Sequence, residues 1–190
     1  MGRTLGLIGF GLIPRALVPK AKGFGLRILA YDPYVSAAVM NEVGVEAVEL
    51  DRLLRESEFI SLHADLTAET RHMLGAEQFR LMKPTAYLIN TARGPLVNEA
   101  ALYEALTQGI IAGAGLDVTE VEPVKLDNPL LKLGNVIFTC HSGHYSDVSA
   151  ERYRQRPVED VSRIMAREWP RGLINPEVKE KYIAKWGKAK

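Results

Sequence analysis

The chain has 190 residues, a net charge of +1 and 47% hydrophobic residues, a composition typical of an ordinary globular protein with one main core. The balanced charge argues against nucleic-acid or anionic-membrane partners, which usually face a concentrated basic patch. The single cysteine, Cys140, excludes an internal disulfide, and no apolar run is long enough to span a membrane, so we expect a cytoplasmic protein without a metal site.

Short aliphatic or β-branched runs alternate with helical patterns along the chain. The predicted strands are Thr4–Ile8, Arg27–Tyr31, Phe59–Leu62, Ala86–Asn90, Ala112–Val118 and Val136–Thr139. The predicted helices are Pro14–Lys22, Ser36–Val43, Leu50–Ser57, Ala76–Met82, Glu99–Gln108 and a last one that begins at Ser146. Strands separated by crossover helices lie parallel and buried on both faces, which predicts a doubly wound α/β/α sheet of the Rossmann type.

The domain organisation follows from where this alternation ends. We expect residues 1–170 to form the α/β domain and residues 171–190 to form a C-terminal tail. The lysine-rich end, from Lys179 to Lys190, is expected to be solvated.

The first predicted strand runs into the glycine turn of "LGLIGFGLIPRAL". In a doubly wound sheet this turn opens a helix, whose free N–H groups and dipole favour a pyrophosphate. Gly9 and Gly11 fit such a turn, but Pro14 stands where a third glycine is usual, although proline is tolerated in a first helical turn. On these residues alone, a purely structural turn remains an equal alternative.

Asp32 ends the second predicted strand, about 20 residues after Gly11. An acidic side chain at this place can accept hydrogen bonds from the adenosine ribose, and it would repel a 2′-phosphate. Gly9, Gly11 and Asp32 together therefore favour NAD over NADP, with a simple turn before Pro33 as the alternative interpretation of Asp32.

Several further motifs occur in a fixed order: "YDPY", "LINTARGPLVNEAAL", "AGAGLDVTEVEP", "NPLLKLGNVIFTCHSGHYS" and "GLINPEV". With the glycine turn, they resemble the NAD-binding domain of the D-isomer-specific 2-hydroxyacid dehydrogenases over residues 3 to about 177. That family includes phosphoglycerate, glyoxylate and hydroxypyruvate reducing enzymes and the related C-terminal-binding corepressors. The resemblance does not select a substrate.

The resemblance implies three catalytic residues: Arg93, Glu122 and His141. Their chemistry suits the reduction of a 2-oxo acid. The planar fork of Arg93 can bind the carboxylate, and His141 can donate a proton to the developing alkoxide near neutral pH. Glu122 would fix the tautomer of the imidazole. Each residue alone also has a structural interpretation, as a surface ion pair, a loop cap or a strand-end histidine.

The same resemblance implies the remaining contacts to the coenzyme. The amides of Leu12 and Ile13 would bind the pyrophosphate, Ala64, Thr91 and Ala92 would line the dinucleotide, and Asp117 would contact the nicotinamide carboxamide. His63 and His72 are expected to be strand-end and surface residues and not catalysts.

The resemblance starts at the cofactor domain, so we expect the chain to lack the family's separate N-terminal substrate domain. We therefore expect a truncated or partner-dependent part of an NAD-dependent oxidoreductase that transfers hydride between NAD(H) and a small 2-hydroxy or 2-oxo acid. We also expect a homodimer, because relatives dimerise through this domain. The alternatives are a corepressor-like, non-catalytic NAD-binding interaction module and a fragment with neither activity.

Overall fold

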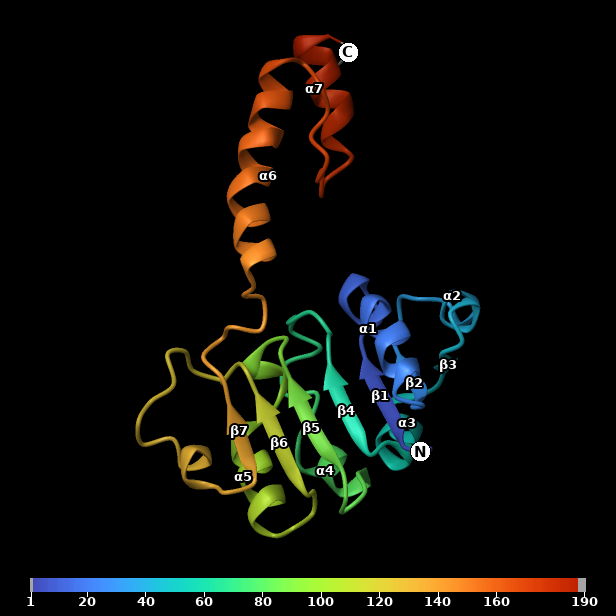
Figure 1. The fold of residues 1–190 in the computed structure, drawn as a ribbon, viewed down its shortest axis with the longest axis vertical. Helices are drawn as coiled ribbons and strands as arrows, with labels where there is room; N and C mark the ends of the chain where they lie inside the picture. The colour runs from blue at the N-terminus through green and yellow to red at the C-terminus, as the bar shows by residue number, and fades with distance from the viewer. Residues whose placement is uncertain (1, 188–190) are drawn as a thin grey trace. The chain divides into compact units, whose positions relative to one another are not determined.

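The computed structural model describes residues 2–187, and the part of the chain up to Phe138 contains a seven-stranded, all-parallel sheet (Figure 1). The strands lie in the order β3-β2-β1-β4-β5-β6-β7, so the chain reverses its direction of winding between β1 and β4. The strands are β1 (Thr4–Ile8), β2 (Arg27–Tyr31), β3 (Glu46–Ala47), β4 (Phe59–Leu62), β5 (Tyr87–Asn90), β6 (Gly113–Leu116) and β7 (Val136–Phe138). The predicted doubly wound parallel sheet is confirmed.

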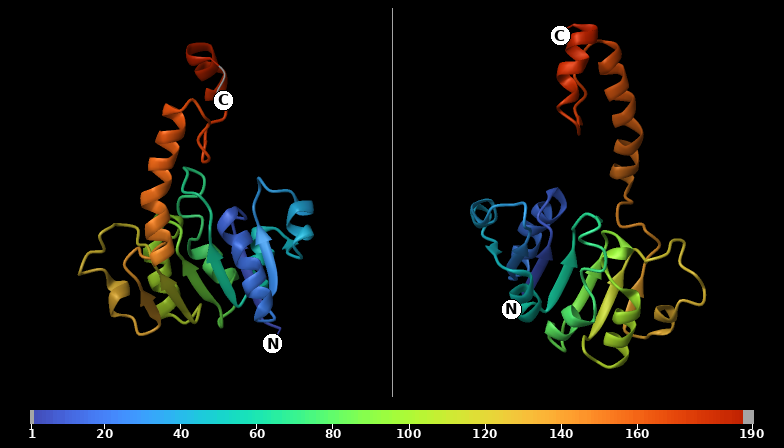
Figure 2. Two further views of the ribbon diagram at one scale, coloured as in Figure 1. Left: turned by 45° about the horizontal axis from the view of Figure 1, so that its top comes forward. Right: turned by 180° about the vertical axis from the view of Figure 1, so that it is seen from behind.

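The helices before β7 connect the strands and cover the sheet, and further helices follow β7 in the second part of the chain (Figures 1 and 2). They are α1 (Leu12–Gly23), α2 (Ala37–Glu42), α3 (Leu50–Glu56), α4 (Ala76–Leu81), α5 (Glu99–Thr107), α6 (Asp147–Met165) and α7 (Val178–Trp186), with 3-10 turns at Gly94–Leu96 and Pro129–Lys132. The N-cap of α5 is Asn98, whose side chain accepts a hydrogen bond from the amide of Ala101 at 2.9 Å.

Alternating side chains of the strands pack into two separate cores. On one face, Leu5 and Leu7 of β1 pack with Val18 and Ala21 of α1. On the other face, Ile8 belongs to a larger cluster of side chains from β4, β5, β6 and helices α3, α4 and α5. Helices on both faces thus hold the strand ends in fixed positions.

The sheet face that carries Leu5 and Leu7 is less covered at strands β5, β6 and β7. Tyr87 of β5 and Ile137 of β7 share the face of Leu5 and Leu7, and they are 44% and 73% exposed. Gly113 and Gly115 of β6 lie between them in the register. This part of the sheet therefore presents apolar side chains without a helical cover from the first compact unit.

The carboxyl ends of the strands are aligned at one edge of the sheet. The register pairs Ile8 with both Tyr31 and Leu62, and it continues through Asn90 and Leu116 to Phe138. Because parallel strands lie about 4.8 Å apart, the row from β1 to β7 spans about 19 Å. The loops that follow these strands consequently emerge side by side along one edge.

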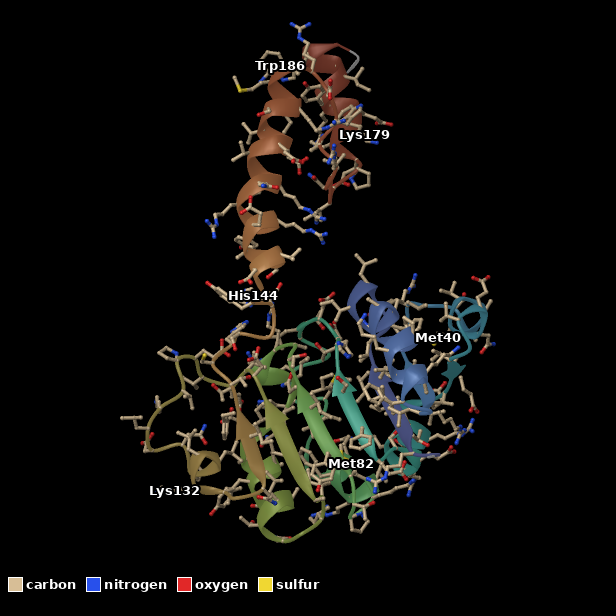
Figure 3. All side chains as sticks on the ribbon, viewed as in Figure 1. Met40, Met82, Lys132, His144, Lys179 and Trp186 are labelled. Atoms are coloured by element: carbon tan, nitrogen blue, oxygen red, sulfur yellow. The ribbon has the colours of Figure 1, made fainter. Side chains whose placement is uncertain are left out.

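The chain divides into two compact units, one ending at Gly143 and one beginning at His144. In the second unit, Ser146 caps α6, and the ring of Trp169 contacts that of Tyr182, with centroids 5.0 Å apart. Lys179, labelled in Figure 3, lies 5.3 Å from the centroid of Trp169. Helix α7 falls in the segment for which the sequence predicted a solvated tail, and the predicted division at residue 170 into a domain and a tail stays a prediction.

Candidate functional site

The turn after β1 requires a glycine at position 9. Gly9 has a φ of +93°, and a Cβ added there would lie 2.7 Å from the amide nitrogen of Ala64. The turn after β1 therefore touches the turn after β4, at the point where the sheet reverses its winding. In doubly wound sheets, ligands bind in the crevice at this point.

Helix α1 begins directly after this turn, with Gly11 as its N-cap. The amides of Leu12 and Ile13 lie in the first helical turn and so have no intrahelical acceptor. A Cβ added at Gly11 would meet nothing within 4 Å, so the space beside the N-cap of this helix is open. Pro14 is buried in this turn, where its missing N–H is not needed. The turn fits a pyrophosphate group.

Asp32 lies at the same corner. It directly follows β2, and its carboxylate accepts hydrogen bonds from the amides of Phe10 at 2.7 Å and Tyr34 at 2.9 Å. Each carboxylate oxygen has a further acceptor site, and the side chain is partly exposed. The structure thus brings Asp32 and the glycine turn together, with acceptor capacity left for sugar hydroxyls.

The loop after β5 is held by a residue that the sequence analysis missed, Asn90. This side chain is buried, and its Oδ1 accepts a hydrogen bond from the amide of Ala92 at 3.0 Å. Its Nδ2 donates to the carbonyl of Arg93 at 2.9 Å. The sequence signal that could have indicated this role is a polar residue at the end of a buried strand. Asn90 fixes the backbone of Thr91, Ala92 and Arg93, all three of which are predicted site residues.

Arg93 follows this loop with an exposed side chain. Its Nη1 donates a hydrogen bond to the carbonyl of Ala92 at 2.6 Å. Within residues 2–187, the guanidinium forms no ion pair with an acidic side chain. The rest of its donor fork is therefore available to a carboxylate ligand.

Two loops of the candidate site touch through Gly94. A Cβ added at Gly94 would lie 1.9 Å from the carbonyl oxygen of Thr119, so the two backbones are in direct contact. Arg93 precedes Gly94, and Glu122 follows Thr119 by three residues. The predicted arginine and the predicted carboxylate consequently lie on loops that pack against each other.

Glu122 is paired with His141. The Nδ1 atom of His141 lies 2.9 Å from Oε2 of Glu122, while Oε1 of Glu122 accepts a hydrogen bond from the amide of Thr119 at 3.2 Å. The side chains of His141 and Glu122 are 47% and 40% exposed. A carboxylate acceptor at Nδ1 favours the proton on that nitrogen, which directs the chemistry of the ring to Nε2.

Asp117 supports the loop that carries His141. Its carboxylate accepts hydrogen bonds from the hydroxyl of Thr139 and from the amides of Ser142 at 2.9 Å and Gly143 at 2.8 Å. Burial opposes the ionisation of Asp117, but these hydrogen bonds outweigh it and lower the pKa of the carboxyl. Its carbonyl also accepts the amide of His141 at 2.8 Å. The predicted contact of Asp117 with a nicotinamide carboxamide stays a prediction.

A cavity of about 700 Å³ borders the Glu122–His141 pair. Besides these two residues and Asp117, it is lined by Thr119, Pro123, Val124, Phe138, Thr139, Cys140 and Ser142. Arg93 is not among the lining residues. The cavity therefore lies between the loops after β6 and β7, and not over the loop after β5.

His63 directly follows β4 and lies beside the glycine turn. Burial lowers its pKa to about 4, and its Nε2 lies 3.0 Å from the hydroxyl of Ser61. It is neutral near pH 7 and acts as a strand-end residue, as expected. Among the residues that the structure describes, no cluster of three metal-ligating side chains is present. None of the helices in residues 2–187 is long and apolar enough to cross a membrane.

The reversal of winding between β1 and β4, the open helix start and the acid at the end of β2 define a dinucleotide-binding domain. Residues 1–143 match the family described as "D-isomer specific 2-hydroxyacid dehydrogenase, NAD binding domain", and the chain belongs to that family. NAD is therefore its cofactor, as predicted, and the residues at the glycine turn fit that group.

Known relatives agree with this assignment. A glyoxylate reductase of Korarchaeum cryptofilum is 50% identical over 177 residues, which are 93% of this chain and 53% of that protein. A D-3-phosphoglycerate dehydrogenase of Methanocaldococcus jannaschii is 42% identical over 97% of this chain and 35% of that protein. The structure is similar to that of D-lactate dehydrogenase with NAD+ from Lactobacillus jensenii, with a TM-score of 0.82, 34% identity and coverage of 91% of this chain and 56% of that one. The chain spans about half the length of the curated relatives it matches, or less.

Proposed function

We propose that this chain is the NAD-binding half of a D-2-hydroxyacid dehydrogenase that transfers hydride between NAD(H) and a small 2-hydroxy or 2-oxo acid. The observation that carries the proposal is the 2.9 Å pairing of His141 Nδ1 with Glu122 Oε2, on a loop that packs against the Arg93 segment. Bound NADH supplies the hydride.

In this proposal Arg93 binds the substrate carboxylate through its planar donor fork. His141 donates a proton from Nε2 to the oxygen of the reduced ketone, because Nδ1 is engaged by Glu122. Glu122 holds the ring in that tautomer and stabilises the imidazolium before the transfer. In the reverse direction, Nε2 accepts the proton of the hydroxyl group.

The coenzyme contacts are part of the same proposal. The amides of Leu12 and Ile13 bind the pyrophosphate, and Asp32 accepts hydrogen bonds from the adenosine ribose. Ala64, Thr91 and Ala92 line the dinucleotide between these two ends, and Asp117 contacts the carboxamide. The open space at Gly11 and the position of Asp32 beside Phe10 support this path along the strand ends.

A chimeric enzyme tests the proposal. This chain replaces the matching 177-residue segment of the Korarchaeum cryptofilum glyoxylate reductase, and NADH oxidation is measured with glyoxylate, hydroxypyruvate and pyruvate. We expect turnover, and we expect His141→Gln to lower kcat by about 10²- to 10⁴-fold, the usual contribution of a general acid. A folded, NADH-binding chimera whose rate is unchanged by His141→Gln would refute the assignment.

The test also separates the alternative of a non-catalytic NAD-binding interaction module. Such a module would bind NADH and change its assembly state without turnover in the chimera. The homodimer and the cytoplasmic location stay predictions, and light scattering of the 190-residue chain with and without NADH measures the first of them.

A further inference from the structure

A second set of ionisable side chains lies next to the candidate site, outside the pair described above. Glu120 stands two residues before Glu122, and its carboxylate makes two contacts with other segments. Oε1 pairs with Nε2 of His72, and Oε2 accepts a hydrogen bond from the amide of Glu99 at 3.3 Å. The Glu120 side chain thus joins the loop after β6 to two segments that are distant in the sequence.

The contact between Glu120 and Glu99 is reciprocal. Oε1 of Glu99 accepts the amide of Glu120 at 2.5 Å, and its Oε2 accepts the side-chain amide of Asn128 at 2.9 Å. Glu99 is the first residue of α5, where N–H groups lack intrahelical acceptors and the helix dipole favours negative charge. Two carboxylates are therefore accommodated at one helix start.

His72 is held on the same framework. Its φ is +55°, its amide donates to the carbonyl of Pro95 at 2.8 Å, and Leu74 forms a parallel bridge with Val97. The segment that bears His72 is thus paired with the segment that runs from Arg93 to Asn98.

The Glu122–His141 ion pair is too exposed to hold its two loops in place without further contacts. Both side chains are about half exposed, and an exposed ion pair contributes only about 0 to 1 kcal/mol, too little to fix two loops by itself. By contrast, Thr119 is buried, and the Glu120 side chain is only 27% exposed. The less exposed attachments of the loop are therefore those of Thr119 and Glu120.

We propose that His72, Glu99 and Glu120 form a clasp that positions Glu122 against His141. This inference rests on the proposed function of the Glu122–His141 pair and deepens it, by assigning three positioning residues that touch neither substrate nor coenzyme. The clasp acts by fixing the Thr119 amide and hence the Glu122 carboxylate that this amide contacts.

The 190-residue chain itself allows a test that needs no turnover. Amide hydrogen exchange of Thr119 reports the loop, and the ¹⁵N shifts of the His141 ring report its tautomer. We expect Glu120→Ala to speed exchange at Thr119 by about tenfold, as for the loss of a hydrogen bond to a charged group. The ring shifts should move toward those of a solvated imidazole. Glu120→Gln, which keeps an acceptor for the Glu99 amide, should restore part of both signals.

Glu104→Ala is the matched control, because Glu104 is an exposed glutamate of α5, the helix that starts at Glu99. This variant should change neither the exchange rate of Thr119 nor the ring shifts of His141. If Glu120→Ala does not fold, His72→Gln tests the same clasp at a more exposed position. Folded Glu120→Ala or His72→Gln variants with wild-type exchange and wild-type ring shifts would overturn the inference.

The failure of the clasp can be distinguished from the failure of the proposed function. Unchanged spectra, in a chimera whose rate still depends on His141, refute only the clasp. A rate that does not depend on His141 refutes the proposed function, while the spectra still decide whether His72, Glu99 and Glu120 position the loop.

Discussion

Gly94 and Thr119 are in backbone contact, since a Cβ added at Gly94 would lie 1.9 Å from the Thr119 carbonyl oxygen. This contact brings the arginine loop after β5 against the glutamate loop after β6. Both loops start from strand ends that are paired in the register, Asn90 with Leu116. The sheet therefore places the two loops next to each other, and the missing side chain of Gly94 lets their backbones touch.

The first prediction concerns this contact. Gly94→Ala should destabilise the fold by about 2 to 3 kcal/mol or more, because neither backbone can move away without disturbing a strand end. Urea unfolding measures the change. Gly115→Ala is the matched control, because an added Cβ there meets nothing within 4 Å, and it should have little effect. Equal stabilities of the two variants would show that the loops are not in contact.

The second prediction concerns the choice of coenzyme. Asp32→Asn keeps an acceptor for the Phe10 amide but removes the negative charge where we propose that the adenosine ribose binds. NADH binding should weaken by about tenfold or more, as for the loss of a hydrogen bond to a charged group, and binding of NADPH relative to NADH should improve. Calorimetric titration with both coenzymes measures this ratio. Asp51→Asn, an equal charge change on the exposed surface of α3, should leave it unchanged.

The third prediction concerns pH. Burial lowers the pKa of His63 from 6.5 to about 4, so the unfolded chain takes up a proton in a range where the folded chain does not. The contribution of His63 to stability is complete above pH 6.5 and falls as the pH drops to about 4. Because one pKa unit corresponds to about 1.36 kcal/mol, the free energy of unfolding falls by about 3 kcal/mol over this pH range.

Urea unfolding at several pH values between 7 and 4 tests this expectation. His63→Gln should remove the fall in the free energy of unfolding that His63 causes between pH 6.5 and 4. A change in stability that is the same at every pH does not affect this comparison. Parallel pH profiles for the wild type and His63→Gln would contradict the burial of a neutral imidazole at this position.

Much of the fold is predictable from local patterns. The strands Thr4–Ile8, Arg27–Tyr31 and Phe59–Leu62 have the predicted bounds, because short apolar runs between turn residues mark buried parallel strands. The two-residue strand β3 was not predicted, since Glu46 and Ala47 carry no periodic signal. Helix α7 was also missed, because its lysines resemble a solvated tail and none of its side chains is buried.

The candidate site was predictable only in part. The places of Gly9 and Asp32 at strand ends follow from the topology. Arg93, Glu122 and His141 were identified through the resemblance, and their catalytic roles stay predictions. The clasp could not be predicted, because His72, Glu99 and Glu120 meet only after three separate segments have folded together. The role of Asn90 likewise depends on the path of the loop that its amide holds.

In the proposed function, the coenzyme lies along the carboxyl ends of the strands, from the glycine turn toward the Glu122–His141 pair. Titration of the ¹⁵N-labelled chain with NADH measures where it binds. We expect amide shift changes at Gly11, Ile13, Asp32, Thr91 and Arg93, and at the loop of His141. Changes confined to the opposite edge, at Gly25, Ala112 and Asn135, or no changes with the fold intact, would contradict this position of the coenzyme.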